Sequence, residues 1–429
     1  MEWREFSARL LAARPVLTSV HDRTQHYTIG GRDGMSFRGK TAIVGIGETA
    51  HKRSWPNRSA LGLAAEAAAE AINDAGLRRE DIDGLISISM SFLPQRVAEY
   101  VGIRPHGFAA GVGMNGATPG AAITIAAALL DEGCCNYILF VNGNARDPEN
   151  PGSFTGAPGE AGGPARPDFI SEFVSPYGPA IAANTNYALL YTRHMHKYGT
   201  KPEQLARISV NQRFNAGPNP LAAMRDPITV DDVLNSRYVN YPLHILECVM
   251  PCAGGIAFIM TTAERARLLR RPPVYVLGAA VAQGYDNSWL TPDLCQTATA
   301  FSAPAAYRMA GYGPKDFQFA EFYDCYTILH ATTLEDAGIC PKGEIGPFFE
   351  STDTTFKGSF PINTDGGQLS CGQFIAGSSG TQHVTEAVRQ IRGMAGERQV
   401  ARHDLCVVNV NGGSPSQEAT MVLGSANAL

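Results

Sequence analysis

Short apolar runs alternate with alanine-rich stretches along most of the chain, and this alternation predicts its elements. Residues 41–47 form an apolar run that ends in glycine, which is typical of a buried parallel strand. A helix is predicted over residues 60–74, because Ser59 can cap its start and Gly76 can end it. Residues 81–90 are the next predicted strand. Strand, helix and strand in this order form a parallel crossover, so an α/β fold is predicted.

The same pattern returns 235 positions later in the chain. In the first copy, Ala-Gly at 75–76 ends a helix and Asp-Ile at 81–82 opens a strand. In the second copy, Ala-Gly at 310–311 and Asp-Phe at 316–317 stand at matching positions. A repeated unit predicts two pseudo-twofold-related halves. The predicted organisation is an N-terminal extension (1–38), an N-terminal half (39–270) with a loop insertion (about 144–240), and a C-terminal half (271–429).

The insertion begins with a segment dense in glycine and proline, residues 144–167. This segment is too long for an ordinary connection. Helices are predicted after it, over residues 181–198 and 202–216. We expect the insertion to cover either a binding site or a dimer face.

The composition excludes several kinds of function. A net charge of −5 with 17% charged residues offers no basic surface for nucleic acid. The longest apolar run, residues 121–130, is about half the roughly 20 residues that a membrane-spanning helix needs. The nine cysteines are scattered, without a Cys-x-x-Cys pair or a histidine in metal-binding spacing. We therefore expect a cytoplasmic protein with reduced thiols, no bound metal ion, no bound cofactor and no membrane span.

Two glycine-rich loops stand before predicted helices. Residues 361–373 read Pro-Ile-Asn-Thr-Asp-Gly-Gly-Gln-Leu-Ser-Cys-Gly-Gln and precede a helix predicted over 381–392. Paired glycines allow close approaches that a Cβ would forbid, as in an active-site loop. Residues 114–120, Met-Asn-Gly-Ala-Thr-Pro-Gly, precede a helix that is apolar nearly all round. Two interpretations of that helix stay open: its free N–H groups hold an anion or oxyanion, or it is simply buried.

These loops and three further motifs resemble, in order and spacing, those of the thiolase superfamily. The further motifs are Glu-Phe-Tyr-Asp-Cys-Tyr-Thr at 321–327, Glu-Ala-Val-Arg-Gln-Ile-Arg-Gly at 386–393 and Asn-Gly-Gly at 411–413. The chain resembles most the branch of sterol-carrier, or lipid-transfer, thiolase-like proteins, from about residue 39 to the end. The resemblance implies a five-layered α-β-α-β-α thiolase fold, a homodimer, and a site where two central helices meet over an acyl-CoA thioester substrate.

The catalytic set of the thiolases is missing from this chain. Their nucleophilic Cys, loop His and second Cys correspond here to Ala117, Gln373 and Asn409. Without a thiolate at position 117 no covalent acyl-enzyme forms there, so ordinary thiolysis should fail. Backbone N–H groups do not depend on those side chains, so the substrate cradle is expected to survive. The residues expected to bind substrate are Asn115, Gly116, Ala117, Thr118, Gly366, Gly367, Asn409 and Gly412.

Relatives without the catalytic set are either silent carriers or retro-aldolases that work with a small OB-fold, zinc-ribbon partner of the DUF35 type. Retro-aldol cleavage needs a base for the β-hydroxyl and a group that stabilises the thioester enolate, but no cysteine. Tyr323 and Asp324 occupy the family's Tyr-Asp motif, and a tyrosine with a lowered pKa would serve as the base. The alternative is that this pair only braces the loop.

Three more side chains are candidates for the chemistry. Gln373 stands where the aldolases have a tyrosine, and it can only form hydrogen bonds. Tyr326 is a candidate for supplying the missing hydroxyl. Cys371 is either a displaced nucleophile or a small packed thiol.

The function expected from this resemblance is retro-aldol cleavage of a β-hydroxyacyl-CoA side chain by a homodimer that works with a DUF35 partner. The first alternative is an acyltransferase with a non-standard nucleophile. The second is a catalytically silent subunit that binds acyl-CoA or lipid.

Overall fold

The structure is a computed structural model that describes residues 36–88, 93–145, 182–285, 291–374, 379–413 and 415–429. A compact unit begins at Phe37. The predicted extension, residues 1–38, lies almost wholly outside the described residues, as does most of the glycine- and proline-rich segment 144–167. The predicted division into halves at residue 270 stays a prediction.

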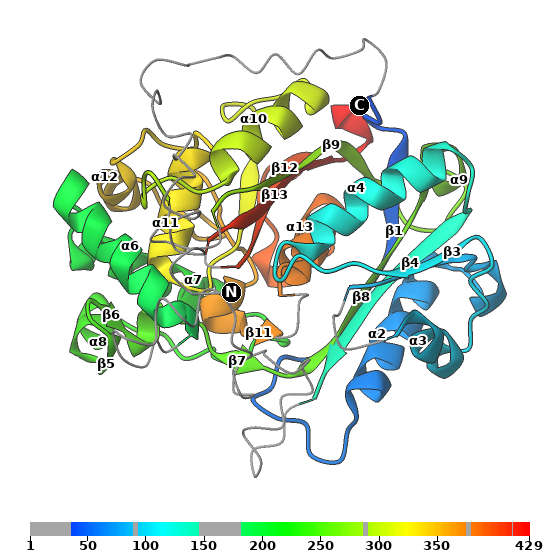
Figure 1. Cartoon of the computed structure of the whole chain (residues 1–429), viewed down its shortest axis with the longest axis horizontal. Helices are drawn as coiled ribbons and strands as arrows, with labels where there is room; N and C mark the ends of the chain where they lie inside the picture. The colour runs from blue at the N-terminus through cyan, green and yellow to red at the C-terminus, as the bar shows by residue number, and fades with distance from the viewer. Residues whose placement is uncertain (1–35, 89–92, 146–181, 286–290, 375–378, 414) are drawn as a thin grey trace, which may run out of the picture. The chain divides into compact units, whose positions relative to one another are not determined.

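The described residues contain a nine-stranded sheet (Figure 1). Its strands are β1 (Thr41–Glu48), β2 (Gly84–Ser87), β3 (Phe108–Gly111), β4 (Tyr137–Asn144), β8 (Gly254–Thr262), β9 (Val274–Gln283), β10 (Phe319–Phe322), β12 (Leu405–Gly412) and β13 (Gln417–Gly424). Their order across the sheet is β10-β12-β13-β9-β1-β8-β4-β2-β3. Strand β2 begins later than predicted, because residues 79–81 form a 3₁₀ turn before it, and residues 89–90 of the predicted strand lie outside the described residues.

The strand directions repeat between the two parts of the sheet. In the first part β2 is parallel to β4, β4 is antiparallel to β8, and β8 is antiparallel to β1. In the second part β10, β12, β13 and β9 follow the same sequence of directions. Strands β2 and β10 have the same 235-residue offset that the sequence shows. The predicted pseudo-twofold repeat is therefore confirmed.

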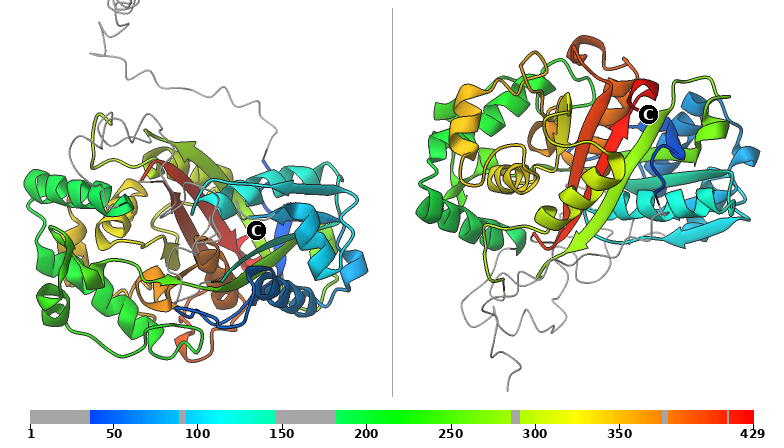
Figure 2. Two further views of the ribbon diagram at one scale, coloured as in Figure 1. Left: turned by 60° about the horizontal axis from the view of Figure 1, so that its bottom comes forward. Right: turned by 90° about the horizontal axis from the view of Figure 1, so that it is seen from above.

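Four helices complete the layers, two outside and two between the strand sets. They are α2 (Ala60–Ala75), α4 (Thr118–Asp131), α10 (Thr299–Ala310) and α13 (Thr381–Ile391). Helix α2 packs on β1, β4 and β8, whereas α10 packs on β9 and β13. Helices α4 and α13 contact strands of both parts, so they form the middle layer. Strands β9, β12 and β13 run side by side on one side of that layer (Figure 2).

Close packing explains the glycine pattern of the first strand. Gly47 faces the alanine-rich side of α2, and a Cβ on it would lie 2.1 Å from the carbonyl oxygen of Ala67. Gly45 is alike, since a Cβ on it would lie 2.2 Å from the Ala71 carbonyl oxygen, and its equivalent in the second part is Gly278, where a Cβ would lie 2.3 Å from the Ala306 carbonyl oxygen. The Gly45-x-Gly47 pattern thus serves helix–sheet packing.

Two of the remaining helices pack on the first part of the sheet: α3 (Pro94–Val101) contacts α2, β2 and β3, and α9 (Ala263–Ala266) contacts β1 and β8. The other elements are α6 (Ala182–Tyr198), α7 (Pro202–Ala216), α8 (Val230–Asn235), β5 (Tyr238–Asn240), β6 (Leu243–His244), β7 (Pro251–Cys252), α11 (Thr327–Asp336), α12 (Ile345–Ser351) and β11 (Gln373–Phe374). Helices α6 and α7 match the two helices predicted for the insertion. Among the described residues no helix is both long and apolar enough to cross a membrane.

Candidate active site

The hydroxyl of Tyr323 is the centre of the candidate site. Tyr323 directly follows β10, and its backbone N–H donates to the Asn409 carbonyl oxygen at 2.9 Å. The Gln373 side-chain Nε2 donates to the tyrosine oxygen at 2.8 Å. The tyrosine's own proton is therefore free to be donated to Ser379 Oγ, 2.5 Å away. The phenol is thus held between two neutral partners.

The N-terminal ends of the two middle helices meet beside this hydroxyl. A Cβ on Gly116, just before α4, would lie 2.4 Å from the Tyr323 oxygen. A Cβ on Gly380, just before α13, would lie 2.4 Å from the Gly116 carbonyl oxygen. Gly412 packs on the same loop, because its Cβ would lie 2.2 Å from the Met114 carbonyl oxygen. Only glycine allows these approaches.

The glycine loop that carries Gln373 turns around the Asp324 carboxyl group. Its residues Gly367–Cys371 form a π-helical turn. The N–H groups of Gln368 and Leu369 donate to the two Asp324 oxygens at 2.8 and 3.1 Å. Gly367 has a φ of 57°, and a Cβ on it would lie 2.3 Å from Asp324 Oδ2. Asp324 therefore braces the loop, which was the alternative interpretation of the Tyr-Asp motif.

The insertion holds the same loop from the other side, through α7 and the residues after it. Asn215 Nδ2 donates to the carbonyl oxygens of Ile362 and Asn363 at 3.0 and 3.1 Å. Asn219 Nδ2 donates to the Asp365 carbonyl oxygen at 2.9 Å. These hydrogen bonds hold the backbone of the loop that places Gln373 at the tyrosine hydroxyl.

The start of α4 is less open than predicted. Ala117 N donates to the Met114 carbonyl oxygen at 3.0 Å, and Thr118 N donates to the Asn115 carbonyl oxygen at 3.2 Å. The Thr118 hydroxyl also belongs to this turn, since it accepts from Met114 N at 2.8 Å. A tight turn thus uses the N–H groups of Ala117 and Thr118, which favours the interpretation of α4 as a buried helix, while the substrate-binding role of residues 115–118 stays a prediction.

Asn409 does not join the other predicted residues. Its amide nitrogen donates to Thr299 Oγ1 at 3.2 Å and to Thr420 Oγ1 at 3.0 Å, on the α10 side of the sheet. The next residue, Val410, faces the helix ends, because a Cβ on Gly380 would lie 2.7 Å from its Cγ1. Neighbouring strand residues point to opposite faces, so the side chain that faces the helix ends is that of Val410 and not, as the sequence interpretation had it, that of Asn409.

The tyrosines are not the easily ionised groups that a general base requires. Burial raises the pKa of Tyr323 far above its ordinary value, although its hydrogen bonds to Ser379 and Gln373 oppose the shift. Burial likewise raises the pKa of Tyr326, whose ring stacks on Tyr187 with centroids 4.3 Å apart and whose hydroxyl donates to Asn184. The expected lowered pKa of Tyr323 is therefore wrong, and the residue is a neutral phenol.

Cys371 is a packed thiol. It is buried, and burial raises the pKa of its thiol well above the ordinary value. Its sulfur accepts from Asn219 Nδ2 at 3.6 Å. A thiol that stays protonated is a poor nucleophile.

Two functional candidates escaped the sequence reasoning. Ser379 contacts the Tyr323 hydroxyl, and Gln368 joins the group by donating to the Ser379 carbonyl oxygen at 2.8 Å and accepting from Gln373 Nε2 at 3.1 Å. The signal available for Ser379 was its place directly before Gly380 and α13, which matches the place of the 114–117 loop before α4.

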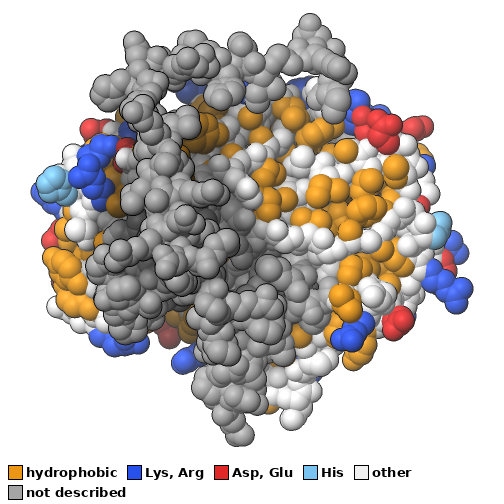
Figure 3. Space-filling view, viewed as in Figure 1, with side chains coloured by type: hydrophobic (Ala, Val, Ile, Leu, Met, Phe, Trp, Pro, Cys, Tyr) orange, Lys and Arg blue, Asp and Glu red, His pale blue; other side chains and the backbone are white. Residues whose placement is uncertain are grey.

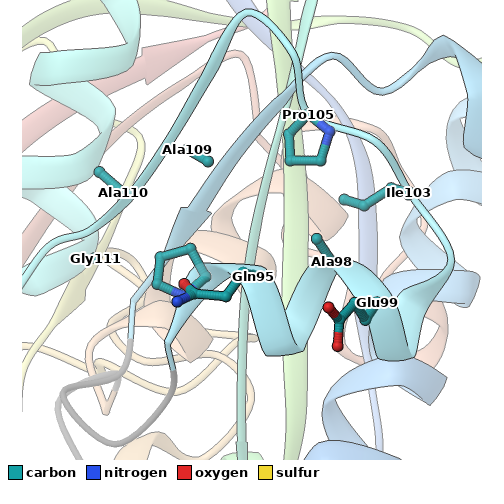
Figure 4. A pocket seen from close by; sticks show the side chains of 9 residues that line it. Gln95, Ala98, Glu99, Ile103, Pro105, Ala109, Ala110 and Gly111 are labelled. Carbon is teal, nitrogen blue, oxygen red and sulfur yellow. The ribbon is translucent and has the colours of Figure 1, made fainter.

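One cavity lies away from this chemistry. It has a volume of about 590 Å³ and lies between α3 and the edge strand β3 (Figure 4). Its lining includes Ile103, Pro105 and Ala109, with Glu99 as the ionisable side chain. None of the predicted site residues lines it.

In the described part of the chain, no group of three or more His, Cys, Asp or Glu residues is arranged to hold a metal ion.

Fold and site together define a thiolase-like protein without a sulfur nucleophile at the meeting point of its middle helices. Residues 281–425 match the family model described as thiolase C-terminal domain-like. The chain is 32% identical over 395 residues to a steroid side-chain-cleaving aldolase of Thermomonospora curvata, covering 90% of this chain and 98% of the relative. It is also 32% identical to the 17-hydroxy-3-oxo-4-pregnene-20-carboxyl-CoA lyase of Mycobacterium tuberculosis, covering 83% of this chain and 92% of the relative.

A solved structure titled Ltp2-ChsH2(DUF35) aldolase matches with a TM-score of 0.79 and 31% identity. The match covers 91% of this chain and 98% of the other. The chain therefore belongs to the thiolase superfamily, in its sterol-carrier thiolase-like branch.

Proposed function

We propose that this chain is an aldolase that cleaves the Cα–Cβ bond of a β-hydroxyacyl-CoA, working with a small OB-fold partner of the DUF35 type. The names of the two relatives and of the matching structure support the reaction, the thioester and the partner. The identity of the acyl chain does not follow from these names.

The observation that carries the proposal is a neutral phenol where a thiolase would use sulfur chemistry. Tyr323 lies between Ser379 and Gln373, at the place where Gly116 and Gly380 bring the helix ends together. Neither Ala117 nor Gln373 offers a nucleophile. Retro-aldol cleavage requires none, whereas thiolysis does.

The raised pKa of Tyr323 supports a role as proton donor. When the Cα–Cβ bond breaks, its electron pair moves into the thioester and forms an enolate, and the β-carbon becomes a carbonyl carbon as its hydroxyl gives its proton to water. The enolate then takes a proton at Cα and leaves as a shorter acyl-CoA. A phenol that is not ionised at rest can donate a hydrogen bond to the enolate and deliver that proton, and the phenolate then regains a proton from water, which closes the cycle.

The activity test uses β-hydroxyacyl-CoA substrates without free CoA, with the chain alone and together with the DUF35 protein. We expect a shortened acyl-CoA and a carbonyl compound as products. Turnover that needs free CoA would instead indicate an acyltransferase. Binding without any product would indicate a silent carrier.

Tyr323→Phe tests the residue assignment. It removes the donated proton and should lower kcat at least about 100-fold, the lower range for general acid–base catalysis. Tyr307→Phe is the matched control, because the hydroxyl of this half-buried tyrosine donates to the carbonyl oxygen of Ala337, the residue that follows α11, away from the loop. Equal rates for the two variants would remove Tyr323 from the mechanism.

A homodimer is part of the proposal. Strand β3 is an edge of the sheet, and an exposed strand edge can pair with another chain. Apolar side chains gather over α4 on the same face, where Ile125 is 38% exposed (Figure 3). Light scattering should give twice the chain mass of 45.8 kDa, and a monomer at micromolar concentration would contradict this.

A cytoplasmic location stays a prediction from the scattered thiols.

A further inference from the structure

A fully buried histidine faces two carboxyl groups behind Tyr323. His383 lies in the first turn of α13, and its ring centroid is 6.0 Å from that of Tyr323. Its Nδ1 is 3.7 Å from Glu321 Oε2, and its Nε2 is 3.5 Å from Asp324 Oδ1. Among the described residues neither ring nitrogen forms a hydrogen bond, and the same is true of Glu321 Oε2. These two carboxyl groups are therefore the partners that the ring is placed to use.

The proton positions follow from the surroundings. Burial, with the nearby charges of Asp365 and Glu386, raises the pKa of Glu321 well above its ordinary value, so its carboxyl group is protonated. Its Oε1 already accepts from Thr364 N and Oγ1 at 3.1 and 2.9 Å, so the proton belongs on Oε2, which faces His383. Burial lowers the pKa of His383 to about 3, so the ring is neutral. A neutral ring that accepts at Nδ1 carries its own proton on Nε2, toward Asp324.

Asp324 connects this ring to the catalytic loop. Its Oδ1 accepts from Gln368 N at 2.8 Å while facing His383 Nε2. The Gln368 side chain in turn contacts Gln373 and the Ser379 carbonyl oxygen, and both of those residues contact the Tyr323 hydroxyl.

We propose that His383 is a positioning residue of the active site: its imidazole bridges Glu321 and Asp324, and through Asp324 it fixes the loop that sets Gln368 and Gln373 around Tyr323. This inference rests on the proposed function for its kinetic consequence only. Its structural consequence, a loop held rigid by the ring, is independent of the reaction.

The test compares two variants of His383 in the full chain with its partner. His383→Gln keeps a donor and an acceptor on a side chain of similar reach, whereas His383→Leu keeps the volume and removes both. Hydrogen–deuterium exchange of the 366–372 segment gives a readout that needs no substrate. We expect exchange at least tenfold faster in the Leu variant and unchanged in the Gln variant. For retro-aldol turnover we expect kcat to fall at least tenfold in the Leu variant, with KM within about twofold of the wild type, and to recover in the Gln variant.

Other outcomes overturn the inference. Wild-type exchange and kcat in the Leu variant would show that the ring only fills space. Equal losses in both variants would show that bridging is not its role. If the Leu variant does not fold, Glu321→Gln replaces it as the test, because the glutamine amide can donate to His383 Nδ1 as the protonated carboxyl group does. Faster exchange of the 366–372 segment in folded Glu321→Gln overturns the proposed bridge. Unchanged exchange supports it. Absence of turnover in the wild type would reject the proposed function and leave the exchange result standing.

Discussion

Gly116→Ala is the most direct perturbation of the place where the middle helices meet. A Cβ at this position would lie 2.2 Å from the Asn411 carbonyl oxygen, 2.4 Å from the Tyr323 hydroxyl oxygen and 2.6 Å from Tyr323 Cε2. Gly116 is not among the glycines with positive φ, so alanine meets no backbone strain there. Any effect of the substitution must therefore come from the contacts.

The size of the effect follows from which atoms can move. A carbon and an oxygen that do not bond stay about 3.2 Å or more apart, so each contact needs about 1 Å of movement. The Asn411 carbonyl is held in the β12–β13 ladder, so residue 116 must itself shift away from it, and the tyrosine ring must yield to the new Cβ. Overpacking of this kind costs about 1–3 kcal/mol of unfolding free energy. A shift of about 1 Å at a catalytic group lowers the rate about 100-fold.

The measurements are urea denaturation and steady-state retro-aldol kinetics on the same preparation. Gly313→Ala is the matched control, since a Cβ there meets nothing within 4 Å and its φ is not positive. The control should keep the wild-type kcat and gain up to about 1 kcal/mol of stability from reduced freedom of the unfolded chain. If Gly116→Ala keeps the wild-type kcat, the Tyr323 hydroxyl does not act at this contact, and the site has been placed wrongly.

The remaining predictions concern a thiol and a carboxyl group. Cys371→Ser should keep kcat within about threefold of the wild type, because the buried thiol stays protonated, and a loss of 100-fold would make it the nucleophile. Burial raises the pKa of Asp324 from its ordinary 3.8 to about 7, so its contribution to folding is present below pH 4 and is lost as the pH rises to 7. The unfolding free energy of the wild type minus that of Asp324→Asn should therefore fall over this interval, by up to about 1.4 kcal/mol per pH unit, and a flat difference in urea titrations would contradict this.

The sequence predicted the elements well where two independent signals agreed. The repeat at 235 positions fixed β2 and β10, and the glycines after α2 and α10 fixed where those helices end. Both glycines adopt the left-handed conformation, with φ of 73° and 72°. A helix-ending glycine can be recognised from the local sequence, because glycine adopts the left-handed conformation that this position requires.

The errors at the site have a different origin. Strand β12 is buried on both faces, so its sequence has no alternation that could tell the side of Asn409 from that of Val410. The ionisation of Tyr323 depends on burial by elements distant in the chain, which no spacing reports. Ser379 and Gln368 reach the tyrosine from positions about 50 residues away. Contacts between residues so far apart in the chain can be identified only once the fold is known.

Electrostatics favours an aldol reaction in the site as it stands. An enolate is an anion, and a second full negative charge close by in a dry site would raise its energy steeply. The two carboxyl groups behind Tyr323 avoid this, since Glu321 is protonated, and burial raises the pKa of Asp324 to about 7, so this group carries only part of a charge at neutral pH, which the N–H groups of Gln368 and Leu369 hold. The direct partners of the phenol, Ser379 and Gln373, are neutral. Negative charge therefore develops in front of a neutral donor, and a neutral, preorganised donor stabilises it without the thiolate and imidazole that thiolysis needs.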